Sequence, residues 1–339
     1  MPGLSFLTGG KDLIGKPTRN LAMELVRVTE AAALAAGRFM GRGDKKAADK
    51  ASVDAMRLML NTIDMDGIIV IGEGEKDEAP MLYNGERVGT GALPQMDIAV
   101  DPIDGTRPLS NGLPNSIATV AISPRGSMFD PGPFVYMNKI AVGPEAKGVV
   151  SIDAPVEENL LAVARAKESE LEDLTVVILD RPRHEQLIAE VRRLGCRIRL
   201  ILDGDVSGAL MTAWPGSGID VLMGIGGTPE GVLAACALRA MGGEIQGKLY
   251  ARNEQELRRG QEMGYDFDRL LTMDDLVASD DVFFAATGIT DGELLDGVKY
   301  YSHGARTSSL VVRGLTGTVR EITSSHLWEK LRKISAIEY

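Results

Sequence analysis

The chain has 339 residues, and 37 basic against 48 acidic side chains give it a formal charge of −11. Hydrophobic residues make up 44% and charged residues 25%, the balance of a folded globular protein, which excludes a wholly disordered chain. The length predicts about two domains or one large layered domain. A chain with a net negative charge binds the phosphate backbone of nucleic acids poorly, so we expect no nucleic-acid partner.

Nothing in the sequence indicates export or a membrane span. Residues 1–16 lack an apolar run of signal-peptide length, and the longest uncharged stretch, 108–124, contains three prolines. Cys196 and Cys236 cannot build a disulfide framework, and they are not spaced as zinc ligands. We therefore expect a cytoplasmic protein with buried free thiols and no membrane partner.

The first part of the chain predicts two helices and then strands. Apolar residues step by three and four from Leu21 to Phe39, and a second amphipathic helix is expected over 47–61. On that second helix Asp49 shares the apolar face with Val53, so a carboxylate points inward. Strands are predicted at 67–71, 96–100, 116–122 and 135–142, the last two pairing antiparallel across a loop rich in Pro and Gly.

Helices and strands alternate in the second part of the chain, which predicts a parallel sheet with crossover helices. Expected helices are 157–167, 184–194, 205–213 and 229–241, and expected strands are 175–179, 197–202, 219–224 and 244–250. Strand-like runs at 282–286, 308–313 and 317–322 follow. We expect a metal-binding catalytic α+β domain over 1–150 and a substrate-binding α/β domain over 151–339, with the assignment of the last strands left open.

Acidic side chains gather where two of the predicted strands end. Glu73 and Glu75, like Asp77, follow the first strand, and Asp101 and Asp104 follow the second. With Asp49, the residues Glu73, Glu75, Asp101 and Asp104 form one expected group. At about 4 Å and an effective dielectric near 20, each like-charged pair costs about 4 kcal/mol, so neutralising cations are required. Oxygen ligands favour Mg²⁺ or Mn²⁺, and the chain's three histidines are not spaced for zinc. We predict two or more divalent ions.

Each of these features also has an ordinary structural interpretation. Residues 73–78 alone suit a solvated loop, and residues 101–106 alone suit a turn. Glu230 follows Pro229 at an expected helix start, where a glutamate also simply improves the helix. Asp205 suits an N-cap, and arginines before a helix suit its surface. The coincidence of two acidic turns with an inward carboxylate favours a site.

Two runs closely resemble the class II fructose-1,6-bisphosphatases. They are Gly72-Glu-Gly-Glu-Lys-Asp-Glu-Ala-Pro-Met-Leu-Tyr83 and Asp97-Ile-Ala-Val-Asp-Pro-Ile-Asp-Gly-Thr106. The resemblance extends from about Leu21 to Ile322, and the second run marks the wider lithium-sensitive, metal-dependent sugar and inositol phosphatase superfamily. It implies an α/β protein with the layered αβαβα sugar-phosphatase fold, whose N-terminal sheet is mixed and whose C-terminal sheet is mostly parallel.

The resemblance also implies residue roles. The matching metal ligands are Asp49, Glu73, Asp101, Asp104 and Glu230. Thr106 matches the threonine that orients the attacking water with Asp49, and Glu75 and Asp77 are implied as catalytic or supporting groups. Positions matching the substrate site are Asp104, Gly105, Thr106, Tyr136, Arg181, Arg183, Asp203, Asp205 and Gly227. Many class II members have Glu where this chain has Asp104, which shortens one arm of the metal site.

The expected reaction is metal-dependent hydrolysis of the 1-phosphate of fructose 1,6-bisphosphate, as in gluconeogenesis, by a homo-oligomer (dimer or tetramer). Sedoheptulose 1,7-bisphosphate stays open as a second substrate. An inositol monophosphatase or a nucleotide 3′-phosphatase is the alternative within the superfamily. A dehydrogenase is disfavoured because Pro229 stands where the dinucleotide fingerprint after Gly224 needs glycine. A non-catalytic sensor is disfavoured by the intact acidic set.

Overall fold

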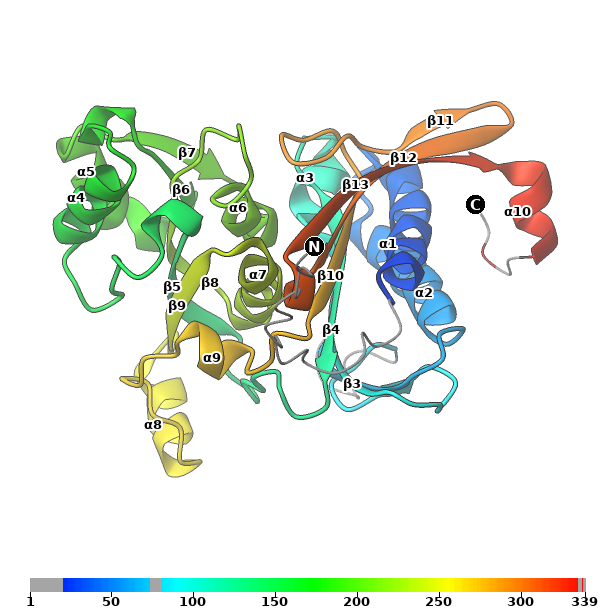
Figure 1. Cartoon of the computed structure of the whole chain (residues 1–339), viewed down its shortest axis with the longest axis horizontal. Helices are drawn as coiled ribbons and strands as arrows, with labels where there is room; N and C mark the ends of the chain where they lie inside the picture. The colour runs from blue at the N-terminus through cyan, green and yellow to red at the C-terminus, as the bar shows by residue number, and fades with distance from the viewer. Residues whose placement is uncertain (1–20, 74–80, 335–336, 338–339) are drawn as a thin grey trace, which may run out of the picture.

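The computed structural model describes residues 21–73, 81–334 and 337, and it forms five alternating layers of helices and sheets (Figure 1). Helices α1 and α2 form one outer layer, and helices α4 and α5 form the other. Between them lie two sheets, with α6 and α7 packed between the sheets. The expected layered α/β architecture is therefore confirmed.

The first sheet has the strand order β11-β12-β10-β4-β3-β1-β2, and β13 pairs with β12. Its strands are β1 (Asp66–Ile71), β2 (Arg87–Val88), β3 (Gln95–Asp104), β4 (Ile117–Pro124), β10 (Phe283–Gly288), β11 (Lys299–Tyr301), β12 (Gly304–Arg313) and β13 (Thr318–Leu327). Strands β1 and β3 are parallel, and the other pairs are antiparallel, so the sheet is mixed as expected.

The second sheet has the order β7-β6-β8-β5-β9. Its strands are β5 (Tyr136–Val142), β6 (Thr175–Leu179), β7 (Arg197–Ile201), β8 (Val221–Gly227) and β9 (Glu244–Leu249). Strand β6 pairs in parallel with β7 and β8, whereas β5 runs antiparallel to both β8 and β9. All strands except β5 share one direction, so the sheet is mostly parallel.

The predicted pairing of residues 116–122 with 135–142 is wrong. Strand β4 is bordered by β3 and β10, so both of its edges are occupied within the first sheet. Strand β5 instead enters the second sheet between β8 and β9. The chain later returns, because β10 to β13 belong to the first sheet. Sheet membership thus changes near residues 125–135 and 250–282, while the division into domains at residue 150 stays a prediction.

The helices bury apolar faces in three large cores of the described chain, and a small fourth cluster joins α1 to α2. They are α1 (Ala22–Ala36), α2 (Lys45–Leu60), α3 (Thr106–Asn111), α4 (Val156–Ala166), α5 (Glu185–Arg193), α6 (Asp205–Met211), α7 (Thr228–Met241), α8 (Glu254–Glu262), α9 (Met273–Leu276) and α10 (Trp328–Ile334). One core joins α1 and α2 to the first sheet, a second fills the space between the sheets around α6 and α7, and a third joins α4 and α5 to the second sheet. Helices α3, α8, α9 and α10 were not predicted from the sequence.

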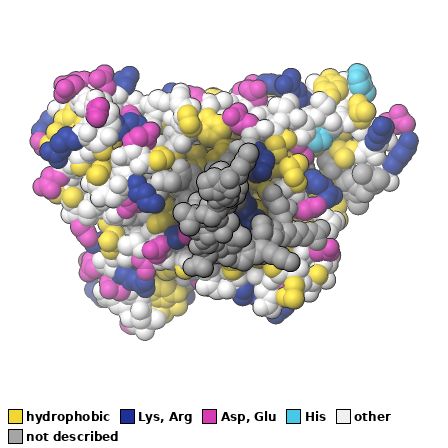
Figure 2. Space-filling view, in the orientation of Figure 1, with side chains coloured by type: hydrophobic (Ala, Val, Ile, Leu, Met, Phe, Trp, Pro, Cys, Tyr) yellow, Lys and Arg dark blue, Asp and Glu magenta, His cyan; other side chains and the backbone are white. Residues whose placement is uncertain are grey.

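Acidic and basic side chains are interspersed over the described surface of the face in Figure 2. Among the helices that the structure describes, none combines the length and the apolar character needed to cross a lipid bilayer. Charges of one sign gather in the interior cavity between the sheets and not on this outer face.

Candidate active site

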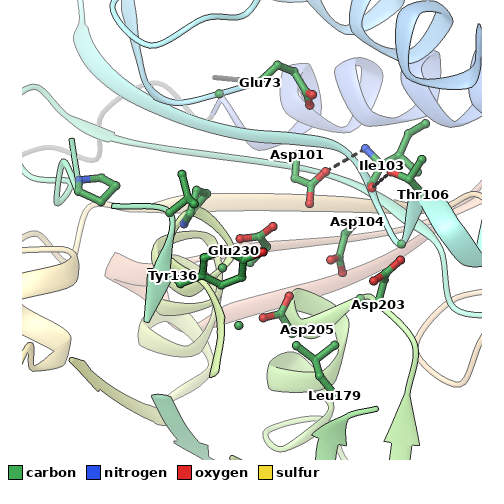
Figure 3. Close-up of a pocket in the computed structure, with 18 of the residues that line it drawn as sticks. Glu73, Asp101, Ile103, Asp104, Thr106, Tyr136, Leu179, Asp203, Asp205 and Glu230 are labelled. Carbon is green, nitrogen blue, oxygen red and sulfur yellow. Dashed lines mark hydrogen bonds between the residues drawn. The ribbon is translucent and has the colours of Figure 1, made fainter. Parts of the chain in front are cut away.

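A cavity of about 1100 Å³ lies between the two sheets. Every predicted site residue that the structure describes lines it: Asp49, Glu73, Asp101, Asp104, Gly105, Thr106, Tyr136, Arg181, Arg183, Asp203, Asp205, Gly227 and Glu230. Glu75 and Asp77 lie outside the described residues. Side chains separated by up to 181 positions in the chain therefore meet in one place (Figure 3).

The first sheet supplies carboxylates from the ends of two parallel neighbours. Glu73 follows β1 and Asp101 lies near the end of β3, so both side chains reach the same edge of the sheet. Residues 101–104 were expected as a turn, but β3 continues to Asp104, with an irregular register against β4 between Asp101 and Asp104. This irregularity turns both carboxylates into the cavity, where Figure 3 shows them facing Glu230.

The end of β3 is fixed by local hydrogen bonds. The Ile103 N–H donates to Asp101 Oδ1 at 3.0 Å, and Gly105 then adopts a φ of 96°, which favours glycine, before α3 begins at Thr106. The Thr106 hydroxyl lies 3.3 Å from Asp49 Oδ1 and 3.2 Å from the Ile103 carbonyl oxygen. The expected pairing of Thr106 with Asp49 is thus present in the geometry.

Asp104 connects the two halves of the cavity. Its Oδ2 accepts a hydrogen bond from the Ser207 N–H of α6 at 3.0 Å. The same helix begins after Gly204, which has a φ of 90° and acts as the N-cap without a side-chain hydrogen bond. The N-cap interpretation of Asp205 is therefore wrong, because Asp205 is the first helical residue and its carboxylate faces the cavity.

Lys139 is the main polar residue that the sequence did not reveal. It lies in β5, its side chain is 2% exposed, and its Nζ is 2.5 Å from Asp205 Oδ2. Lys139 also donates to the Gly227 carbonyl oxygen at 2.9 Å. A Cβ on Gly226 would lie 2.0 Å from Asp205 Oδ2, so this glycine makes room for the pair. A lysine inside an apolar strand was the available signal.

The second half of the cavity also carries arginines. Arg181 forms an ion pair with Asp203, and Arg107 lies 3.5 Å from the other oxygen of that carboxylate. Arg183 donates to the Ile225 carbonyl oxygen at 2.8 Å. The cavity is further lined by Arg252 and Arg259, which, like Arg107, were not predicted. These arginines follow no strong sequence motif.

Burial and mutual repulsion raise the pKa of the first group of carboxylates. Burial, with the charges of Asp49 and Glu230, raises the pKa of Glu73 to about 7. Burial and Asp205 raise the pKa of Glu230 to about 7. The pKa of Asp101 lies well above its usual range because the side chain is buried and Asp104 is close. Each carboxylate would therefore gain from a nearby cation.

The donor set fits hard divalent cations. Asp49, Glu73, Asp101, Asp104 and Glu230 form no ion pair with any residue in the described ranges, and Glu230 Oε2 is buried without a hydrogen-bond partner there. No three Asp, Glu, His or Cys side chains of the described chain stand close enough to enclose an ion alone. Mg²⁺ commonly takes one or two carboxylates and fills its remaining positions with water and substrate phosphate.

Glu230 is held close to the backbone at the start of α7. A Cβ on Gly227 would lie 1.6 Å from Glu230 Oε2, so only glycine leaves room for the carboxylate in this position. Pro229 occupies the first turn of α7, where its missing N–H costs no hydrogen bond. The sequence left Glu230 open between a helix-stabilising and a site role, and the structure places it in the cavity.

Comparisons with known proteins identify the family of the chain. A family model described as bacterial fructose-1,6-bisphosphatase, glpX-encoded, matches residues 19–326. The chain is 47% identical over 325 residues to the Escherichia coli K12 protein named fructose-1,6-bisphosphatase 1 class 2, covering 92% of this chain and 96% of the relative. A Shigella flexneri class 2 protein has the same identity and coverage. An Anabaena inositol monophosphatase structure matches 57% of this chain and 70% of its own, with 16% identity and a TM-score of 0.32.

Proposed function

The chain belongs to the family of bacterial glpX-encoded fructose-1,6-bisphosphatases, and we propose that it hydrolyses the 1-phosphate of fructose 1,6-bisphosphate in the cavity between its two sheets. The products are fructose 6-phosphate and phosphate. The observation that carries the proposal is the meeting of unpaired carboxylates with arginines in one cavity of about 1100 Å³. A small bisphosphate fits a cavity of that size.

We propose Mg²⁺ or Mn²⁺ as the cofactor, held by Asp49, Glu73, Asp101, Asp104 and Glu230. Phosphate monoesters hydrolyse extremely slowly in water, and bound divalent cations supply activation of water and neutralisation of charge on the leaving oxygen. The raised pKa values of Glu73 and Glu230 support this role, because they express the cost of ionising these carboxylates without a cation.

The protein's own groups would orient the reactants. Thr106 and Asp49, 3.3 Å apart, would hold the attacking water between a hydroxyl and a carboxylate. Asp49 is suited to accept a proton, because burial raises its pKa. Gly105 has no side chain at its left-handed φ and lets backbone approach the phosphate closely. Glu75 and Asp77 keep their proposed catalytic role on the resemblance alone.

The second half of the cavity would bind the sugar and the phosphate that is not cleaved. Asp203 and Asp205 carry carboxylate oxygens that can accept hydrogen bonds from sugar hydroxyls, and the lining backbone of Gly227 is close by. Arg183 has no carboxylate partner among the described residues, because its guanidinium donates to the neutral Ile225 carbonyl group. Tyr136 presents its ring beside that guanidinium, 5.3 Å from its centre.

A phosphate-release assay tests the proposal. The full-length protein is assayed with fructose 1,6-bisphosphate in Mn²⁺, in Mg²⁺ and in excess chelator, beside sedoheptulose 1,7-bisphosphate and inositol 1-phosphate. We expect release of one phosphate from the fructose ester only when a cation is present. Cleavage of inositol 1-phosphate without cleavage of either bisphosphate would contradict the proposal.

We further propose that the enzyme acts in the cytoplasm as a homo-oligomer, a dimer or a tetramer. This proposal rests on the resemblance to the family. Light scattering on the purified full chain measures the molar mass, which for a dimer is twice the mass expected from the sequence. A monomer at micromolar concentration would contradict it.

A further inference from the structure

Helix α8 brings unpredicted arginines to the cavity. Arg252 precedes the helix and Arg259 lies within it, and both line the cavity wall. Figure 1 shows α8 as a projection from the end of the second sheet, next to α9. The segment therefore reaches the site from outside the two sheets, and its contacts decide how firmly these arginines are placed.

An aromatic cluster fixes α8 against the cavity wall. Phe134 lies in the loop whose neighbours Pro133 and Val135 line the cavity, and its ring is 4.6 Å from that of Tyr265 and 5.1 Å from that of Phe267. Both pairs meet edge to face, a favourable aromatic geometry. A Cβ on Gly260 would lie 2.9 Å from Phe134, so the residue next to Arg259 packs directly on this cluster. The backbone that carries Arg259 is thus held in place.

The arginines at this end of the cavity differ in how they are neutralised. Arg252 is paired with Glu256, with Nη2 3.0 Å from Oε1. Arg183 donates to the neutral Ile225 carbonyl group. The Arg259 side chain has no hydrogen bond and no ion pair with any residue of the described chain, although its charge lowers the pKa of Glu256. Neither Arg183 nor Arg259 therefore forms an ion pair with a carboxylate of the described residues.

The positive groups come from separate segments but converge. Arg183 follows β6 and Arg252 follows β9, and their guanidinium carbons lie 5.3 Å and 5.8 Å from the Tyr136 ring centre. Arg259 lines the same cavity from α8. The three side chains are exposed to solvent, where an anion can reach them, and arginine forks match phosphate oxygens in pairs. The carboxylates of the first sheet line the opposite wall, so a bisphosphate can place one phosphate at each.

We propose that Arg259, with Arg183, binds the phosphate that is not cleaved and thereby makes the enzyme select sugar bisphosphates over monophosphates. The inference rests on the proposed function. It adds a specificity-determining residue from α8, and it assigns that helix a role in substrate binding. Arg259 touches the substrate in this account but not the reacting phosphate.

The test compares two adjacent arginines on one helix. Arg259→Gln is assayed beside Arg258→Gln, because Arg258 pairs with Glu254 at 3.3 Å and does not line the cavity. With fructose 1,6-bisphosphate and Mn²⁺, we expect Arg259→Gln to raise KM by about tenfold or more and to leave kcat within about twofold, as the loss of a charged hydrogen bond predicts. Arg258→Gln should match the parent enzyme, and Arg259→Lys should recover part of the affinity.

Kinetics with a monophosphate substrate distinguish binding of the second phosphate from other roles of Arg259. With fructose 1-phosphate as substrate, Arg259→Gln and the parent enzyme should have the same KM, because no second phosphate is present. An equal rise in KM for both sugars, a fall in kcat alone, or identical behaviour of the two glutamine variants would each overturn the inference. If the parent enzyme releases no phosphate from the bisphosphate, the proposed function fails first. Calorimetry with fructose 6-phosphate then still measures whether Arg259 binds a sugar phosphate.

Discussion

The two walls of the cavity differ in how their carboxylates are neutralised. Carboxylates that follow strand β7 of the second sheet are matched by cations of the chain itself: Asp203 pairs with Arg181, and Asp205, the first residue of α6, pairs with Lys139. Asp101 and Glu73 on the first sheet have no such partner among the described residues, and their pKa values are raised. The carboxylates of one wall are therefore neutralised within the chain, and those of the other wall are not neutralised by the described residues.

This difference supports the proposal that the cation binds at the first wall and the sugar at the second. A buried carboxylate without a partner is costly unless a proton or a metal ion neutralises it. The second wall can meet a polar substrate without first binding an ion. The first wall keeps its acidic oxygens available for a cation, and Glu230 joins it from α7, across the cavity. The predictions below test this contrast.

The largest effect is expected for Asp101→Asn. Removing one proposed cation ligand should lower kcat by about 1,000-fold or more with fructose 1,6-bisphosphate and Mn²⁺. In chelator at pH 8 the same variant should unfold at a temperature no lower than the parent protein, because a buried like charge has been removed. Enzyme assays and thermal unfolding measure the two effects. A strong loss of thermal stability in chelator would contradict the unpaired state of this wall.

The matched change on the second wall is Lys139→Met. It leaves Asp205 buried without its partner, which should lower the free energy of unfolding by about 3–5 kcal/mol. Urea unfolding measures the loss. The double variant Lys139→Met with Asp205→Asn should recover part of it, since neither charge then remains. If Lys139→Met is as stable as Lys248→Met, a change at a lysine of β9 that pairs with Asp153, the pair contributes nothing.

The pH dependence of stability is the next effect in size. The folded-state pKa of Glu73 is about 7 against an ordinary 4.5, so between these values the unfolded state binds fewer protons than the folded state. The stability of the metal-free protein should therefore fall as pH rises from about 4.5 to 7 and stay level above it. An isolated group with this shift contributes about 3 kcal/mol.

Urea unfolding in chelator at pH 5, 6, 7 and 8 measures this slope. Mn²⁺ should restore stability most at high pH, where the carboxylates are ionised. The Glu73→Gln variant is the control, because it should flatten part of the slope without metal. Stability that increases from pH 5 to 7 in chelator would refute the account.

The smallest effect is expected for Arg183, in the second half of the cavity. Arg183→Ala should raise KM for the bisphosphate by about tenfold, with little change for fructose 1-phosphate, because the uncleaved phosphate loses one charged hydrogen-bond partner. Steady-state kinetics measure both values. Equal effects on the two substrates would place Arg183 away from that phosphate. High salt should reduce the preference of the parent enzyme for the bisphosphate over fructose 1-phosphate, since Arg183 is exposed.

Local patterns predicted most helices and strands well. The strand at 175–179 coincides with β6, and the helix predicted over 157–167 is α4, displaced by one residue. These segments have strong apolar periods or Gly and Pro at their ends, and such signals act over neighbouring residues. Among the site residues, the acidic runs were visible because they follow buried strands directly.

Partner choice could not be predicted in the same way. Strand β5 joins β8 and β9 rather than β4, since pairing depends on which sheet edges other segments have already filled. For the same reason the sequence did not reveal the partner of Lys139, because Asp205 lies 66 positions away. Arg259 depends on a short helix held by aromatic contacts from elsewhere in the chain.

The sequence by itself determined the acidic runs that follow two strands, the alternation of helices and strands, and the resemblance that names the family. Only the tertiary structure decided which charges are neutralised within the chain and which are left for a cation or a phosphate. The physical reason is range: backbone propensity and hydrophobic period are local, whereas the energy of a buried charge depends on every group that the fold brings within a few ångströms.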